Sequence, residues 1–510
     1  MPDVVVTATR EGQSRAETPA TVDIIGGEDI RKVRPTHPSE IMRLVPGVWV
    51  SATGGEGHMT AIRKPLTTNP MYLYLEDGVP TRSTGFFNHN ALYEINVPMA
   101  GGIEVMKGPG TALYGTDAIG GIVNVSTRPA PPQPEFGLST EGGAFGYGRL
   151  LVTGGRTRVM AGLDVDRSPG GRVEYAIKPT KVGSIYTTYT PGVTTYDYGV
   201  TFLEASPYIQ AETSPSDRLR VSAGLRADHL GYDYRNHLDV VTTGSKRRPA
   251  STDIRYNHLS PKAGATFAFS PNVNGFVSYS HAFRVPSESQ MFRQGSTLNT
   301  LGLKPIKADN LEAGLRAQAG QRWQGEVSVY SLTKTDDILT FTNPDGSRET
   351  LNAGKTLHRG VEVGMRTEPV GFLRLDLSLS IARHTYDEWT PRAGLAYAGK
   401  RMEMAPEVIG NARIAYAPAA LKGADFSLEW VRLGRYFMNP DNDHEYQGHR
   451  LVNLVVNCPV GRGWGGFGRL SNLTDRRYAE STSYTAAEGE LFAPGRPRTL
   501  FGGLQYNWHK

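Results

Sequence analysis

The segment Leu373-Arg-Leu-Asp-Leu-Ser-Leu-Ser-Ile381 alternates strictly between apolar and polar residues. Successive side chains of a β-strand point to opposite faces of a sheet, so this period of two predicts one apolar face and one polar face. The pattern recurs at residues 219–226, 361–366 and 500–508. Soluble β-sandwiches also show it, because one face of each sheet is buried and the other is wet. The pattern alone therefore predicts an all-β region without deciding what surrounds it.

Two further features of this region favour a membrane barrel. The alternating segments run for roughly ten residues or more, as strands that cross a bilayer at a tilt require. Tight connections such as Ser270-Pro-Asn-Val273 alternate with long ones such as residues 285–306. Short turns on one side and long loops on the other are typical of outer-membrane barrels. We therefore predict an antiparallel transmembrane barrel, and we count about sixteen strands in it.

The chain divides at a proline-rich linker, residues 129–134. Its prolines favour an extended, non-helical conformation. Residues 135–510 hold the predicted barrel, residues 11–128 predict a mixed α/β domain, and residues 1–10 form a separate N-terminal segment. Within the α/β domain, Ser39 can cap a short helix that Pro46-Gly47 ends. Four short strands are predicted there, at residues 21–25, 71–75, 102–106 and 121–125.

Composition and motifs exclude several classes of protein. The formal net charge is +5, and the two signs are interspersed without a basic tail, so no nucleic-acid partner is expected. Cys458 is the single cysteine and can form no intramolecular disulfide. The chain contains no GK[ST] phosphate loop, no HExxH and no GxSxG. We therefore expect no enzyme, no metal site of a known motif and no permanently bound cofactor.

Several motifs resemble those of TonB-dependent outer-membrane receptors. The N-terminal segment Asp3–Arg10 is similar to a TonB box, the strand offered to an energy-coupling protein. Residues 38–48, 74–80 and 103–115 resemble the receptors' plug domain, and residues 471–478 resemble a strand near the end of their barrel. The resemblance implies an α/β plug enclosed by a barrel of twenty-two strands. It also implies residence in the cell outer membrane of a Gram-negative bacterium.

The strand count is where the chain departs from this family. After Gly154 the sequence passes directly into residues 160–167, which resemble a strand several hairpins further along the family's barrel. Either hairpins are missing, or residues 170–196 hide strands that the pattern does not reveal. Because barrel diameter grows with strand number, a narrower barrel would leave less room for a plug.

The resemblance assigns a function and a partner. It implies active import of a scarce ligand, with a ferric siderophore or other iron chelate as cargo. A TonB-type protein would pair edge-on with the N-terminal strand, and the β-branched valines there suit such pairing. The residues of the TonB box are Asp3, Val4, Val5, Val6, Thr7, Ala8, Thr9 and Arg10.

Four charged residues are expected to join the plug to the barrel. The family's "IRG" reads Ile62-Arg63-Lys64 here, and its "RGP" reads Lys107-Gly-Pro109. The period of two points Glu312 and Glu362 toward the barrel interior, and the resemblance implies that they pair with Arg63 and Lys107. The alternative is that both glutamates face water in the lumen. Enclosed cations need partners, because an unpaired buried charge is costly.

Ligand contacts are expected in two plug segments, residues 54–59 and 81–90. Cations, aromatic rings and amides together suit an anionic, partly aromatic chelate. The alternatives are a loop that only packs on the barrel wall, a receptor for haem or cobalamin, and a surface barrel that transports nothing. A soft metal such as copper, bound by His58, Met59, Met71 and His89, is a further alternative. The candidate ligand-binding residues are His58, Arg82, Phe86, Phe87, Asn88, His89 and Asn90.

Overall fold

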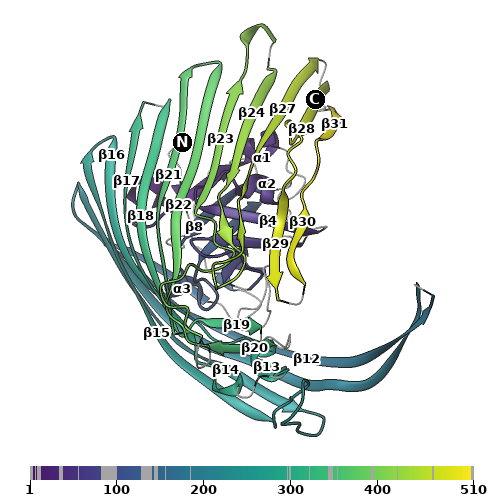
Figure 1. Ribbon diagram of the computed structural model, residues 1–510. Helices are drawn as coiled ribbons and strands as arrows, with labels where there is room; N and C mark the ends of the chain where they lie inside the picture. The colour runs from purple at the N-terminus through teal and green to yellow at the C-terminus, as the bar shows by residue number, and fades with distance from the viewer. Residues whose placement is uncertain are drawn as a thin grey trace.

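The computed structural model shows one large curved sheet around a smaller N-terminal domain, drawn in purple in Figure 1. No helix among the described residues is long and apolar enough to cross a membrane. The structure describes residues 4–5, 7, 13–33, 38–54, 57–69, 71–81, 100–127, 141–142, 148–154, 157–183, 185–295, 297, 300–320, 322–342, 348–352, 354–391, 395–421, 423–461, 464–486 and 488–506.

The N-terminal domain is built on a five-stranded sheet with the strand order β3-β8-β9-β6-β7. Strands β6 and β9 are parallel, and the other neighbours are antiparallel. All four strands predicted for this domain are present, at β3, β6, β8 and β9. The elements are β1 (Val4–Val5), β2 (Gln13–Ser14), η1 (Arg15–Glu17), β3 (Val22–Gly26), α1 (Gly27–Val33), α2 (Pro38–Met42), β4 (Val48–Gly54), β5 (Gly57–Ile62), β6 (Tyr72–Glu76), β7 (Val79–Pro80), β8 (Ala100–Lys107), α3 (Thr111–Tyr114) and β9 (Gly121–Thr127).

The short helix α2 corrects one expectation. It begins at Pro38, not after Ser39, and it ends at Met42. Proline fits the first turn of a helix because the N–H that it lacks has no partner there. The chain then bends through Pro46 and reaches Gly47, whose φ of +75° starts the approach to β4.

Within the described residues, the large sheet contains sixteen strands, all antiparallel to their neighbours. This equals the number counted from the sequence, and the twenty-two implied by the resemblance are not reached in the described residues. Within the same residues, the two end strands β10 and β31 are not paired with each other. The strands are β10 (Glu141–Gly142), β11 (Gly148–Gly154), β12 (Thr157–Val182), β13 (Ile185–Ser216), β14 (Leu219–Asn236), β15 (Thr252–Ser270), β16 (Val273–Arg284), β17 (Ile306–Ala319), β18 (Trp323–Thr335), β21 (Lys355–Val370), β22 (Leu373–Glu388), β23 (Val408–Tyr416), β24 (Asp425–Leu433), β27 (His449–Gly461), β28 (Trp464–Ser471) and β31 (Thr499–Tyr506).

Connections alternate between short and long along the sheet, as predicted. Two residues separate β15 from β16, whereas residues 285–305 lie between β16 and β17. The long connections hold additional short elements and gather at one end of the sheet, the lower end in Figure 1. These elements are α4 (Glu288–Phe292), η4 (Thr300–Gly302), β19 (Ile338–Thr342), β20 (Arg348–Asn352), β25 (Tyr436–Phe437), β26 (Glu445–Tyr446), β29 (Ala479–Thr485) and β30 (Gly489–Pro494), while η5 (Ala419–Leu421) lies in the shorter β23–β24 connection.

Residues 170–196 lengthen two strands and hide no additional ones. Strands β11 and β12 form a tight hairpin in which Gly154 pairs with Thr157. Beyond the reach of β11 and β14, β12 and β13 pair with each other as far as Val182 and Ile185. This ribbon projects away from the sheet in Figure 1. The alternative that residues 170–196 hide additional strands is therefore wrong, which leaves missing hairpins as the explanation of the low strand count.

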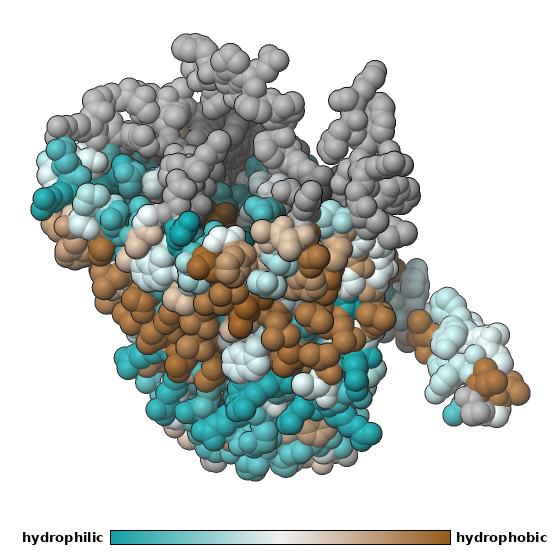
Figure 2. All heavy atoms as spheres, turned by 90° about the horizontal axis from the view of Figure 1, so that it is seen from above, coloured by the Kyte–Doolittle hydropathy of each residue, from teal (hydrophilic) through white to brown (hydrophobic). Residues whose placement is uncertain are grey.

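The two faces of the large sheet carry opposite kinds of side chain. The outward face is apolar and exposed, and Figure 2 shows hydrophobic residues gathered in a broad band across the molecule. The inward face is polar and buried, the reverse of a soluble sandwich. Exposed outward residues include Ile209, Leu225, Leu259, Phe267, Val277, Leu311, Leu315, Val329, Val361, Ile381 and Ile414. Buried inward residues include Glu204, Ser222, Arg226, Ser260, Asn310, Glu312, Arg316, Ser328, Glu362, Asn411 and Arg413.

Candidate functional site at the plug–barrel interface

Arg63 lies where the N-terminal domain meets the inner face of the large sheet. It follows β5 directly with a φ of +54°, which turns the chain out of the strand. Its guanidinium donates to both carboxylate oxygens of Glu312 on β17, at 2.9 and 3.2 Å. It also donates to both oxygens of Glu362 on β21, at 3.1 and 3.3 Å. The side chain of Arg63 is fully buried, so two barrel strands hold one plug cation away from water.

Lys107, the last residue of β8, completes this network. Its Nζ lies 2.7 Å from Glu362 and 2.9 Å from Asp23, and it donates to the carbonyl of Pro46 at 3.0 Å. The structure thus brings together the four charges that the sequence pointed to, and it adds Asp23, which no motif indicated. Burial lowers the pKa of Arg63, but Glu312 and Glu362 raise it by more, so the guanidinium stays charged.

Two glycines allow the chain to come close enough for these pairs. A side chain at Gly47 would place its Cβ 2.3 Å from Oε1 of Glu362. One at Gly108, whose φ is +92°, would lie 3.2 Å from Nη1 of Arg63. Both glycines have a positive φ, which other residues adopt with strain. The plug motifs around residues 47 and 108 therefore shape a close contact, not a phosphate loop.

Two further arginines of the barrel wall bind the plug through polar contacts. Arg316 on β17 donates to the carbonyls of Arg15, Thr18 and Ala20 at 2.6 to 2.7 Å. Arg469 on β28 lies 2.6 Å from Glu40 of α2. Sequence reasoning did not identify these arginines as contacts, although the period of two places Arg316 on the same face as Glu312. An alternating pattern tells which face a side chain takes, but not what it meets there.

Helix α1 of the plug is held in the same way. Asp29 lies 2.7 Å from Arg374, 3.1 Å from Arg366 and 3.4 Å from Arg413. Burial raises the pKa of Asp29, but the guanidinium groups of Arg366, Arg374 and Arg413 lower it by more, so it lies well below its usual range. The carboxylate is therefore ionised at any physiological pH and anchors α1 to β21, β22 and β23.

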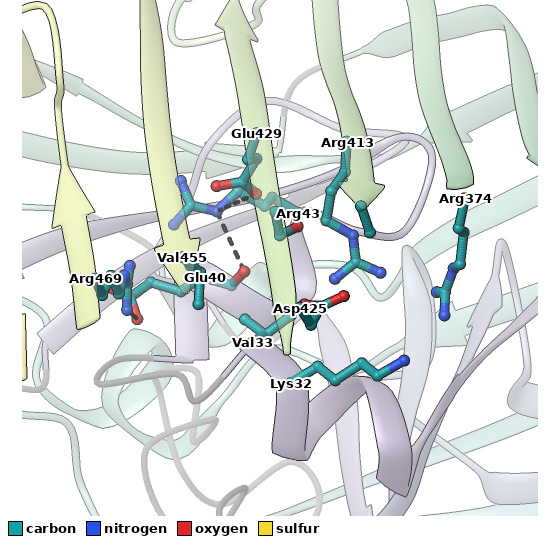
Figure 3. A pocket seen from close by; sticks show the side chains of 12 residues that line it. Lys32, Val33, Glu40, Arg43, Arg374, Arg413, Asp425, Glu429, Val455 and Arg469 are labelled. Carbon is teal, nitrogen blue, oxygen red and sulfur yellow. Dashed lines mark hydrogen bonds and ion pairs between the residues drawn. The ribbon is translucent and has the colours of Figure 1, made fainter. Parts of the chain in front are cut away.

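A narrow pocket beside α1 and α2 is too small for cargo. In Figure 3, Arg43 lies between Glu429 and Glu40, 3.8 Å from the Glu429 carboxylate and 3.2 Å from the Glu40 carbonyl. The free space there is about 30 Å³, enough for one or two waters. Small-molecule sites hold hundreds of cubic ångströms. Charged side chains that already have partners fill this part of the interface.

Lys64, the other departure from the family's motif, is buried as well. It occupies the position where "IRG" has glycine, and its Nζ makes no hydrogen bond to any described residue. Burial, and then the charge of Lys334, lowers the pKa of Lys64 well below its usual value. Lys334 is itself paired with Asp337. The family's motif gives no reason for a cation at position 64, and the fold places Lys64 where a charge is disfavoured.

The N-terminal segment lies against the plug where the structure describes it. In β1, Val4 pairs with Ser14 and Val5 pairs with Gln13 of β2. Thr7 is buried, and its N–H and hydroxyl both donate to Oε2 of Glu104, at 2.9 and 2.5 Å. Part of the strand expected to engage the coupling protein is therefore paired within the chain. The other TonB-box residues, Asp3, Val6, Ala8, Thr9 and Arg10, lie outside the described residues.

The predicted ligand contacts are only partly described. His58 lies on β5 and is buried. Met59 packs against the cluster around Trp49, whereas Met71 lies in a different core cluster, so the proposed copper ligands are not gathered in the described part of the chain. No group of three His, Cys, Asp or Glu in those residues could hold a metal ion. Arg82, Phe86, Phe87, Asn88, His89 and Asn90 lie outside the described residues.

Both the barrel and the N-terminal domain match models of known protein families. The family model described as "TonB dependent receptor-like, beta-barrel" matches residues 89–474, and the "TonB-dependent Receptor Plug Domain" model matches residues 14–122. The chain belongs to the TonB-dependent receptor family. The receptor is thus a protein of the Gram-negative outer membrane, and its N-terminal domain is the plug.

A curated relative and two solved structures are similar to this receptor. The vitamin B12 transporter BtuB of Vibrio vulnificus (strain CMCP6) is 33% identical over 358 residues, which are 67% of this chain and 52% of the transporter. The receptor therefore spans about half the length of that relative.

The solved structures share the fold. The copper transporter OprC superposes with a TM-score of 0.75 at 13% identity, over 95% of this chain and 97% of OprC. The ferric yersiniabactin uptake receptor FyuA of Yersinia pestis gives 0.66 at 14% identity, over 96% and 98%. At these identities the similarity shows the fold alone.

Proposed function

We propose that this receptor actively imports a metal chelate across the outer membrane, with energy from a TonB-type protein that pairs with the N-terminal strand. The observation that carries the proposal is the buried network of Arg63, Lys107, Glu312 and Glu362. It holds a separate domain inside the barrel through ion pairs that can exchange partners when the plug moves. The N-terminal segment lies on that same domain, so a pull on it would act on the plug.

Two classes of cargo fit the proposal. A cobalt corrinoid is favoured by the 33% identity to a vitamin B12 transporter. An iron chelate, such as a ferric siderophore, is the expectation from the sequence motifs. Both are large chelates that would be met by the plug segments at the outer mouth, where Arg82 would supply charge and Phe86 contact area.

A binding titration separates these cargoes. Quenching of tryptophan fluorescence would be measured for the folded protein against cyanocobalamin, ferric catecholate, ferric hydroxamate, ferric citrate, haem and Cu(II). Saturable quenching by one chelate, weakened by R82Q/F86A, supports import of that chelate. Saturation by Cu(II) alone, lost in the His58→Ala variant, would replace the chelate with a bare metal.

Deletion of residues 3–10 tests transport itself. Uptake of the bound ligand by cells should stop, while binding by the purified protein stays unchanged, because the deletion removes the strand that meets the coupling protein. If uptake of every tested ligand survives the deletion, active transport driven through the N-terminal strand is wrong.

A further inference from the structure

The outward face of four strands changes from apolar to cationic at one level. On each of β21, β22, β24 and β27, an outward arginine lies two residues from an outward apolar residue. In every case the arginine lies on the side of the long connections, because β21 and β27 begin there and β22 and β24 end there. The arginines and their apolar neighbours are Arg359 with Val361, Arg383 with Ile381, Arg432 with Trp430 and Arg450 with Val452. We call these four arginines the arginine rim.

The rim arginines face one another across the strands. Arg359 is the direct partner of Arg383, and Arg432 is the direct partner of Arg450. Like charges directly opposite each other destabilise a sheet. Among the described residues, no carboxylate lies within 4.0 Å of any of the four. The sheet thus tolerates two repulsive pairs that have no anion in the described chain to offset them.

The loop above the rim carries two more arginines, and these have carboxylate partners of their own. Arg401 bridges to Thr385 of β22, and its pKa is lowered by burial and by the charges of Arg383 and Arg435. Arg401 and Arg435 share the carboxylate of Glu407. Arg435 also lies 3.5 Å from Glu445, so these two guanidinium groups have two carboxylates between them. The uncompensated charge of this sector is therefore that of the four rim arginines.

A sector further along the sheet, at β14 and β15, contains an outward arginine that does have carboxylate partners. On β14, Arg235 also lies near the long connections and faces outward. It lies 2.8 Å from Asp233 and 3.3 Å from Asp253 on β15. Arg235 is therefore a matched contrast to the rim arginines, because two carboxylates of its own sector lie beside it.

We propose that the arginine rim binds the phosphate groups of lipids in the outer leaflet of the membrane. The rim adjoins the apolar band that contacts acyl chains, and the headgroups of the same lipids lie at its level. Guanidinium groups bind phosphate through two parallel hydrogen bonds and keep their charge at the membrane surface. A phosphate between Arg359 and Arg383, or between Arg432 and Arg450, would turn each repulsive pair into an attractive triad.

Native mass spectrometry of the full chain in neutral detergent tests this. The probes are bisphosphorylated lipid A, its dephosphorylated form and inorganic phosphate. The variant R383Q/R450Q, which breaks both pairs, should weaken binding of bisphosphorylated lipid A at least tenfold, and binding of the dephosphorylated form should be weak in every protein. The control R235Q, in the sector that has its own carboxylates, should bind lipid A like the wild type.

Three results would overturn the proposal. The first is equal lipid A binding by the wild type and R383Q/R450Q. The second is a loss in R235Q as large as in the double variant, which would indicate general attraction to charge. The third is displacement of lipid A by millimolar inorganic phosphate, which would indicate a site for free anions. If the double variant does not fold, the single variants R383Q and R450Q give the same comparison.

Discussion

Residues 361 and 362 are neighbours on one strand, yet they lie in opposite surroundings. Val361 faces outward and is 41% exposed, while Glu362 faces inward, is 2% exposed and contacts both Arg63 and Lys107. In a soluble protein the valine would be buried and the glutamate exposed. Here lipid surrounds the outer face and a charged plug fills the inner one. Alternation is thus a property of the strand, whereas what lies on each side decides which face is apolar.

The inner face should be the more sensitive of the two. Glu362→Gln leaves Arg63 with Glu312 and Lys107 with Asp23 as their only carboxylate partners among the described residues, in a buried site. Breaking a buried pair costs about 3–5 kcal/mol. We expect the plug to become susceptible to limited proteolysis while the barrel stays folded. Glu368→Gln, at an exposed position of the same strand, is the matched control, and equal protease resistance of the two variants would contradict the prediction.

A charge introduced on the outer face should destabilise the folded protein. Val329, in the middle of β18, is 48% exposed, whereas the next residue, Tyr330, faces inward and lies under Arg63. Val329→Arg would place a cation among acyl chains, at a cost of about 2–4 kcal/mol near the bilayer midplane. Urea unfolding of the protein in lipid vesicles measures this cost. Val329→Leu should leave stability unchanged, and an arginine variant as stable as the leucine variant would argue against a lipid-facing surface.

Glu288 is a buried carboxylate that, unlike Glu362, forms no ion pair with a described residue. Glu288 in α4 accepts a hydrogen bond from Tyr198, and burial raises the pKa of Glu288 from 4.5 to about 7. The folded loop therefore favours the protonated form. This contribution to stability is fully present below pH 4.5 and is lost as the pH rises toward 7.

Glu288→Gln should remove that pH dependence. The variant is expected to be more stable than the wild type well above pH 7 by about 3 kcal/mol, and equal to it near pH 4. Melting temperatures at pH 5 and pH 8 measure the difference. Glu388→Gln, at the exposed end of β22, should show no such trend. A constant gap between the Glu288→Gln variant and the wild type at both pH values would mean that the carboxyl does not titrate as described.

The smallest effect is expected at the N-terminal segment. Thr7→Val removes the hydroxyl that donates to Glu104 and keeps the shape of the side chain. The loss of one hydrogen bond amounts to about 1 kcal/mol. Hydrogen exchange at residues 4–7 should become several-fold faster, and Thr7→Ser should restore the wild-type rate. Unchanged exchange in Thr7→Val would mean that the backbone pairing of β1 with β2 alone holds the segment.

Much of the architecture could be predicted because it depends on local pattern. The period of two located most strands, and the turn residues located the connections, since both follow from backbone geometry within a few residues. The pairing of Arg63 and Lys107 with Glu312 and Glu362 was accessible through motif resemblance. The hydrogen bonds from Arg316 to the plug could not be predicted, because their acceptors are backbone carbonyls about 300 positions away in sequence.

The sequence by itself determined the strand pattern, the order of the domains and the family to which the chain belongs. Tertiary structure alone decided that the polar face is buried, that Lys64 lies where charge is disfavoured and that Arg359 faces Arg383. The physical reason is that register and enclosure are set jointly by strands far apart in the chain. A charge is stabilised only if the folded structure places a partner or solvent beside it. No single segment of the sequence contains that information.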